Sequence, residues 1–116
     1  MPKLSKKNIL QQSEDISRTL KSKSIHTQHL SFHKRVNDLG VSRIGLAIPK
    51  KNAKRAIDRN RIKRLIREIF RNSLIDQPTD IVVKLQAPVG KKTKKKLRES
   101  ERKQIRQEIF DHFQKK

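Results

Sequence analysis

The lysine and arginine residues between Lys50 and Arg71 are the groups in this sequence most clearly arranged for chemistry. This segment holds ten basic residues and only two acidic ones. A guanidinium group presents a planar fork of donors that matches a phosphate group, and lysine adds a compact positive charge. Residues three or four apart share one face of a helix, where they can contact successive phosphates. The pattern favours phosphate binding; the alternatives are a solvated helix face and a membrane-surface helix, although the apolar residues of the segment are needed for a core.

Three histidines, His26, His29 and His33, are the other groups that could do chemistry. Two histidines and a lysine could cleave RNA by acid–base catalysis, and histidine is also a common metal ligand. In an extended strand, His29 and His33 would lie about 13 Å apart, at about 3.3 Å per residue. No acidic residue lies nearby in the sequence to complete a ligand set. We therefore predict neither a catalytic residue nor a metal site in this chain.

Charge dominates the composition. The 116 residues include 31 lysines and arginines against 11 aspartates and glutamates, which gives a formal net charge of +20. Self-repulsion of this size opposes a compact state unless an anion offsets it, and nucleic acid is the commonest such partner. The length fits one domain. Because the sequence has no cysteine and no long apolar segment, we expect no disulfide, no membrane partner and a cytoplasmic location.

The pattern of apolar residues predicts an α+β fold, a two-layer α/β sandwich in which helices pack on a small mixed sheet. Alternating apolar residues predict strands, and apolar residues three and four apart predict helices. Ser13 followed by two acidic residues is typical of a helix start. The expected order is α-β-β-α-β-α, with helices near residues 13–20, 53–73 and 97–113 and strands near residues 26–36, 42–49 and 80–85.

The helix expected over residues 53–73 has two unlike faces at about 100° per residue. Its buried stripe is expected to hold Ile62, Leu65, Ile66, Ile69 and Phe70. The residues directly opposite this stripe are Asn60, Arg64, Arg67 and Arg71. The basic side chains therefore point away from the core, where they can meet a partner.

The run from Arg43 to Arg71, RIGLAIPKKNAKRAIDRNRIKRLIREIFR, resembles the signature of the bacterial ribonuclease P protein family. In that family a strand ends in a Lys-Lys pair, and the next helix opens with Arg-Asn-Arg before a basic and apolar pattern. The corresponding residues here are Lys50 and Lys51, then Arg59, Asn60 and Arg61, then Lys63, Arg64 and Arg67. The resemblance extends over residues 13–113 and is sharpest over residues 39–71.

The resemblance implies a fold with a four-stranded sheet and a left-handed βαβ crossover, which the general right-handed preference would not predict. It implies two partners, the catalytic ribonuclease P RNA and precursor tRNA, from which the ribonucleoprotein removes the 5′ leader. Catalysis then belongs to the RNA. We expect no small-molecule substrate and no cofactor on the protein alone, and Mg²⁺ in the holoenzyme through its RNA. Residues 1–12 are expected to form a flexible basic leader segment, and residues 13–116 a single RNA-binding domain.

Two groups of site residues follow from these interpretations. The residues expected to bind RNA are Lys50, Lys51, Lys54, Arg55, Arg59, Asn60, Arg61, Lys63, Arg64, Arg67 and Arg71. The resemblance implies a cleft for the leader strand between the first helix and the sheet, with Ile16, Leu20, Phe32, His33 and Arg43 as its candidates. The family usually places aromatic residues at the positions of Ile16, Leu20 and His33. Bases stack less well on aliphatic side chains, so we expect less stacking on the leader here.

Two other functions are compatible with a basic chain of this size. A ribosomal-type or general RNA-binding protein without a processing role would share the charge, but it gives no reason for the run from Lys-Lys to Arg-Asn-Arg. A stand-alone nuclease would need a catalytic constellation that this sequence lacks. Cleavage of precursor tRNA at low magnesium, with and without the catalytic RNA, separates these functions.

Overall fold

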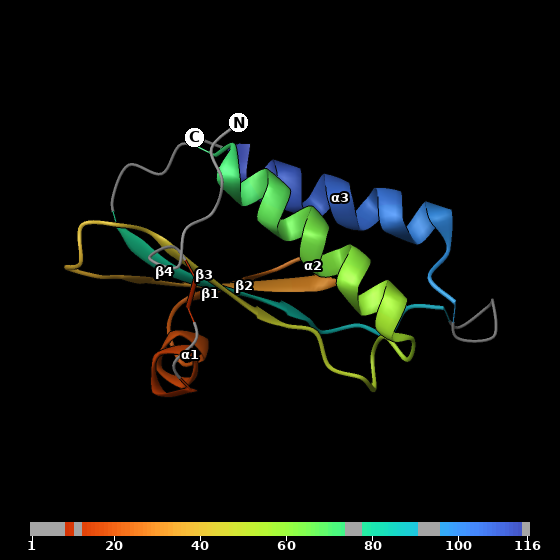
Figure 1. Cartoon of the computed structure of the whole chain (residues 1–116), viewed down its shortest axis with the longest axis horizontal. Helices are drawn as coiled ribbons and strands as arrows, with labels where there is room; N and C mark the ends of the chain where they lie inside the picture. The colour runs from red at the N-terminus through yellow and green to blue at the C-terminus, as the bar shows by residue number, and fades with distance from the viewer. Residues whose placement is uncertain (1–8, 11–12, 74–77, 91–95, 115–116) are drawn as a thin grey trace.

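The computed structural model describes residues 9–10, 13–73, 78–90 and 96–114 (Figure 1). Its helices are α1 (Ser13–Leu20), α2 (Ala56–Arg71) and α3 (Glu99–Gln114). Its strands are β1 (Ser24–His26), β2 (Leu30–Val36), β3 (Arg43–Ala47) and β4 (Thr79–Leu85). The architecture confirms the α+β fold class. One detail differs from the prediction. The segment expected to form one strand over residues 26–36 instead belongs to a hairpin made of β1 and β2.

The four strands form one mixed sheet in the order β1-β2-β4-β3. Strand β2 pairs antiparallel with β1 and β4, whereas β3 pairs parallel with β4. Parallel neighbours need a crossover connection, and α2 supplies it between β3 and β4. At the other edge, the Thr27 N–H donates to the Leu30 carbonyl at 2.8 Å and closes the β1–β2 turn. The crossover therefore places α2 directly on the sheet.

One face of the sheet is covered by α2 and α3, which lie side by side (Figure 1). Side chains alternate along a strand, and Leu30 and Phe32 of β2 point to this face, where both are fully buried. The buried apolar residues of α2 are Ile62, Ile66, Ile69 and Phe70. They confirm the predicted stripe, except that Leu65 at its edge is only partly buried. The core is therefore the layer between these two helices and the sheet.

The opposite face of the sheet carries α1 (Figure 1). Gly45 of β3 allows the chain before α1 to approach closely, because a Cβ at this position would lie 3.3 Å from the Cβ of Leu10. Leu10 is 3% exposed, and its N–H donates to the Ile44 carbonyl at 2.8 Å. Ile9 forms a parallel bridge with Ile44. Two residues of the expected leader segment are thus held on the sheet, whereas residues 1–8, 11 and 12 lie outside the described residues.

Buried carboxylates join the helices to neighbouring loops. Glu108 of α3 accepts hydrogen bonds from the Thr27 hydroxyl and from the His29 N–H at 2.9 Å, and it pairs with Nδ1 of His29 at 2.7 Å. Burial alone would raise the pKa of Glu108, but the bonds from Thr27 and His29 outweigh burial and hold the pKa below its usual value. Asp58 of α2 accepts a hydrogen bond at 3.0 Å from the Leu97 N–H, just before α3.

Ile66→Ala should lower the free energy of unfolding by about 2–5 kcal/mol, because the isoleucine is fully buried and its loss leaves a cavity. Leu65→Ala, at the edge of the same stripe, should lower it less, since Leu65 keeps part of its surface in solvent. Denaturant unfolding followed by circular dichroism measures both changes. Equal losses in the two variants would contradict this assignment of the helix faces.

Glu108→Gln should change how stability depends on pH. Because the folded-state pKa of Glu108 lies below its unfolded value, its contribution is present above about pH 5 and is lost as the pH falls through the folded-state pKa. The variant should therefore be less stable than the unchanged protein at about pH 7, and the difference should shrink towards about pH 3. Asp111→Asn removes an exposed carboxylate from the same helix and is the control. A difference for Glu108→Gln that stayed constant with pH would show that the carboxylate charge is unimportant.

Candidate nucleic-acid interface

The outer face of α2 and the connection before it carry most of the residues expected to bind RNA. Seven of the eleven have exposed side chains: Lys50, Lys51, Lys54, Asn60, Arg61, Arg64 and Arg67. The buried stripe on the inner face of α2 holds the exposed arginines at fixed spacing. No described carboxylate forms an ion pair with any of these seven side chains. The six positive charges among them are therefore available to a polyanion.

The other four residues, Arg55, Arg59, Lys63 and Arg71, are half-buried. Arg59 donates from Nη1 to the carbonyls of Ala53 and Lys54, both at 3.0 Å. Nε of Arg55 lies 3.6 Å from the buried carboxylate of Asp58. These contacts shape the entry to α2. Arg55, at the N-cap, gives no side-chain cap to the first turn, and the positive end of the helix dipole there favours an anion.

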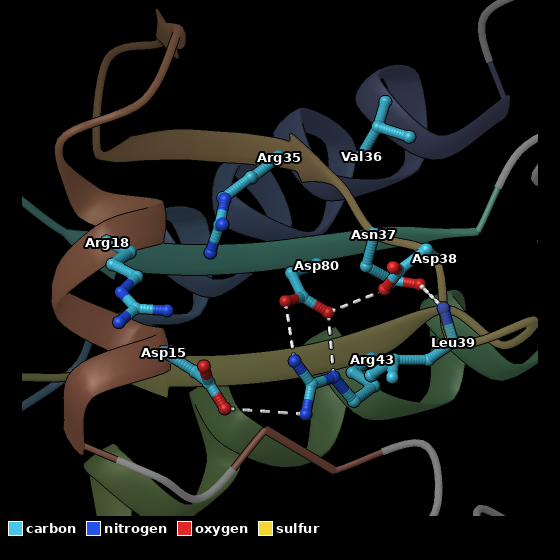
Figure 2. A pocket seen from close by; sticks show the side chains of 9 residues that line it. All are labelled: Asp15, Arg18, Arg35, Val36, Asn37, Asp38, Leu39, Arg43 and Asp80. Atoms are coloured by element: carbon cyan, nitrogen blue, oxygen red, sulfur yellow. Dashed lines mark hydrogen bonds and ion pairs between the residues drawn. The ribbon is translucent and has the colours of Figure 1, made fainter.

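On the other face of the sheet, α1 and the ends of the strands border a hollow of about 620 Å³ (Figure 2). Its lining residues are Asp15, Arg18, Arg35, Val36, Asn37, Asp38, Leu39, Arg43 and Asp80. Of the five residues expected to line the cleft, Arg43 is the one that lines this hollow. Its Nε and Nη2 donate to Asp80 at 2.8 and 2.6 Å, and its Nη1 lies 3.5 Å from Asp15. Two carboxylates therefore offset the charge of Arg43, which ties α1 to the sheet.

The pKa values of this ion group follow from its contacts. The hydrogen bond to Asp80 raises the pKa of Arg43 further above its usual value. Burial alone would raise the pKa of Asp80, but hydrogen bonds from Arg43 and from Asn37, the latter at 2.8 Å, outweigh burial and lower it. Both groups stay charged at neutral pH. This end of the cleft is thus close to electrically neutral, although three arginines line it.

His33 lies on the same face as Arg43, with Ile16 and Leu20 half-buried on α1. Nε2 of His33 lies 2.9 Å from the Ser31 hydroxyl, and its ring centroid lies 6.4 Å from that of His26. Burial and then the charge of His26 lower the pKa of His33, and the Leu20 backbone acts in the opposite direction. Because the net pKa is below its usual value, the ring is neutral at pH 7. His33 is 9% exposed, so it offers this face a small polar edge and no charge.

The expectation that Phe32 lines this cleft is wrong. Phe32 and His33 are adjacent in β2, so their side chains point to opposite faces of the sheet. The Phe32 ring stacks on His112 with centroids 3.9 Å apart and meets Phe113 edge-on at 6.1 Å. It is fully buried among residues of α3. Phe32 belongs to the core on the side of α2 and α3.

The strand register adds residues to the cleft face that the sequence analysis missed. Lys84 of β4 lies opposite Ser31, and His26 of β1 lies opposite Ser31 on its other side. Lys84 is half-buried and also lowers the pKa of His33. The hollow adds Arg18 and Arg35. Alternation from His33 could have found Arg35, but Lys84 and His26 become neighbours only through the pairing of β1, β2 and β4.

The described residues contain no group of three or more histidine, cysteine, aspartate or glutamate side chains that could hold a metal ion. In the same residues, no helix has the length and apolar character needed to cross a membrane. The exposed basic side chains on α2 suit binding of a polyanion.

Comparisons with known proteins agree with this arrangement. The family model described as Ribonuclease P matches residues 4–109. A ribonuclease P protein component from Legionella pneumophila (strain Lens) is 44% identical over 72 residues, which are 62% of this chain and 62% of that protein. Its counterpart from Photorhabdus laumondii subsp. laumondii is 51% identical over 67 residues, 57% and 56% of the two chains. The matches thus span less than two thirds of the length of these relatives.

A solved structure agrees over a longer part of the chain. The ribonuclease P protein from Thermotoga maritima superposes with a TM-score of 0.71 and 25% identity, covering 93% of this chain and 96% of that one. The family match runs from before α1 into α3 and includes every strand. Sequence and fold point to the same group of proteins, and the chain belongs to the ribonuclease P protein family.

Proposed function

We propose that this chain is the protein subunit of a bacterial ribonuclease P ribonucleoprotein, acting in the cytoplasm. It binds the catalytic RNA and the 5′ leader of precursor tRNA, and it assists the endonucleolytic removal of the leader. The observation that carries the proposal is the outer face of α2, where Asn60, Arg61, Arg64 and Arg67 are exposed and pair with no described carboxylate. Membership of the family supports the identity of the RNA partner.

The catalytic RNA is assigned to α2 and the connection before it. Ile62 and Ile66 fix the inner face of the helix in the core, so Arg64 and Arg67 present guanidinium groups from a rigid support. Charge-assisted bonds from such groups to phosphates are stronger than neutral hydrogen bonds. The rigid support also reduces the entropy that binding would otherwise cost.

The leader strand is assigned to the face of the sheet that carries α1. Arg43 contributes little net charge there, because Asp80 and Asp15 offset it. Lys84 and His33 lie farther along the same face and offer a charge and a polar edge. Contacts with this face therefore rely on hydrogen bonding and on the aliphatic residues of α1, and less on stacking.

Holding both RNAs is a form of catalysis by positioning. A precursor bound through its leader keeps the scissile phosphate in place on the catalytic RNA, which with its magnesium ions supplies the chemistry. Basic residues between the two RNAs also reduce their mutual repulsion. The proposal therefore gives the chain no reacting group. A general RNA-binding role would instead leave precursor cleavage unchanged.

Arg64→Ala should weaken binding of a bacterial ribonuclease P RNA transcript by about 1.5–3 kcal/mol, because one charge-assisted phosphate contact is lost. The slope of log affinity against log salt should fall by about one. Titrations at several salt concentrations measure both effects. Lys23→Gln removes one exposed charge near β1 and is the matched control. If Arg64→Ala unfolded the protein, or bound like the control, the assignment of α2 to RNA would be wrong.

The leader assignment predicts that the protein favours precursors with leaders of several nucleotides over a precursor with a single-nucleotide leader, chiefly through KM. His33→Ala should reduce this preference, because it removes a polar edge from the cleft face. Holoenzyme cleavage assays with the two precursors measure the ratio. If cleavage did not depend on leader length, the assignment of the leader strand to the cleft would be wrong, and the assignment of the catalytic RNA to α2 would stand. RNA cleavage by the protein alone, abolished by His33→Ala, would replace the positioning account with a nuclease.

A further inference from the structure

A second recess lies between α2 and α3, on the opposite side of the sheet from α1 (Figure 1). It has a volume of about 260 Å³ and is lined by Leu65, Glu68, Ile69, Arg71, Asn72, Arg106 and Phe110. The two helices run next to each other on one side of the sheet (Figure 1). We call this recess the α2–α3 groove. Of its lining residues, only Arg71 belongs to the RNA-binding set expected from the sequence.

Phe110 is the exposed aromatic residue of this chain. The sequence has four phenylalanines and no tryptophan or tyrosine. Phe32, Phe70 and Phe113 are buried, whereas Phe110 is 41% exposed. Leu65 is partly buried beside it in the lining of the groove. An exposed ring next to an apolar surface is the arrangement on which nucleobases stack in single-strand binding proteins.

Two arginines stand in the walls of the groove. Arg106 on α3 is exposed, and no described carboxylate forms an ion pair with it. Nε of Arg71 on α2 is buried and makes no hydrogen bond to the described residues. Arg71 is half-buried in the lining, so part of its guanidinium side chain remains accessible from the groove. Glu68 is the one carboxylate in the lining, so the groove is positive overall.

We propose that the α2–α3 groove binds one unpaired nucleotide of an RNA strand, with the base stacked on Phe110 and the phosphate held by Arg71 and Arg106. The inference rests on the proposed function for its partner, the ribonuclease P RNA, and adds a contact on α3. The groove continues the basic face of α2, because Arg64, Arg67 and Arg71 follow one another at spacings of three and four residues. A strand bound along α2 thereby reaches the groove.

A protein partner fits the groove less well. Stable protein interfaces bury about 1,200–2,000 Å² in total, and this recess offers one exposed ring flanked by two cations. A second copy of the chain would bring another +20 of charge to the contact, and like charges oppose association. A polyanion offsets the same charge.

The test compares variants in binding to a transcript of a bacterial ribonuclease P RNA. Phe110→Leu keeps an apolar side chain but removes the ring, and it should weaken binding by about 5- to 150-fold. Arg106→Gln should weaken binding and reduce the salt slope by about one. Lys23→Gln is the charge-matched control and should bind like the unchanged protein. Circular dichroism shows whether each variant is folded.

Phe110→Trp gives a direct readout, because the chain has no tryptophan of its own. A stacked base should quench the fluorescence of the introduced indole, while binding is retained. Ile25→Trp places an indole at an exposed site on β1, and its fluorescence should change less.

Three results would overturn the inference. If Arg64→Ala weakened binding but Phe110→Leu and Arg106→Gln did not, the groove would be no RNA site and the proposed function would stand. If the unchanged protein failed to bind the transcript, both would fall together. If Phe110→Leu changed the sedimentation of the free protein and left RNA affinity unchanged, the groove would be a protein interface.

Discussion

The chain has 11 aspartates and glutamates but 31 lysines and arginines, so the positions of the few carboxylates decide which surfaces stay positive. Asp58, Asp80 and Glu108 are buried, and each accepts hydrogen bonds from another part of the chain. Glu101 accepts bonds from the N–H groups of Gly90 and Arg98 before α3. Because these carboxylates lie at the joints between elements, they stabilise the fold without neutralising the outer face of α2. The outer face of α2 stays positive because these carboxylates are used in contacts between elements.

The sheet separates two kinds of surface. On the side of α2 and α3, the apolar residues of every long strand form the core. On the side of α1, β4 contributes Asp80 and Lys84 as well as buried Val82, and polar groups of β2 lie beside them. The group of Arg43, Asp80 and Asp15 anchors α1 on this polar face. The position of α1 therefore depends in part on an ion group whose charges already offset one another.

Local signals predicted the elements well. Ser13 and the acidic residues that follow it predicted α1 within its observed bounds, and helical spacing predicted the inner face of α2. Features that depend on contacts between distant segments were not predicted. Strand β1 has three residues and is defined by its pairing with β2, so alternation alone could not separate it. Phe32 is a different kind of error, because alternation along β2 already excludes Phe32 and His33 from sharing one face; only the structure shows that α3 covers the face of Phe32. The ion group of Arg43 escaped prediction as well, because its two carboxylate partners come from distant segments.

In the proposed role, the charge that suits this protein to RNA also destabilises the free protein. Repulsion among basic residues on α2 is present in the free folded protein and is relieved when phosphates bind. A polyanion that binds only the folded arrangement of those residues would stabilise the fold by mass action. Added salt screens both interactions, and it therefore favours the folded state while it weakens the complex. Folding and RNA recognition are thus coupled through one surface. The core side of α2 must supply enough burial to hold the helix in place before its partner arrives, which is why Ile62 and Ile66 are fully buried beneath the exposed arginines.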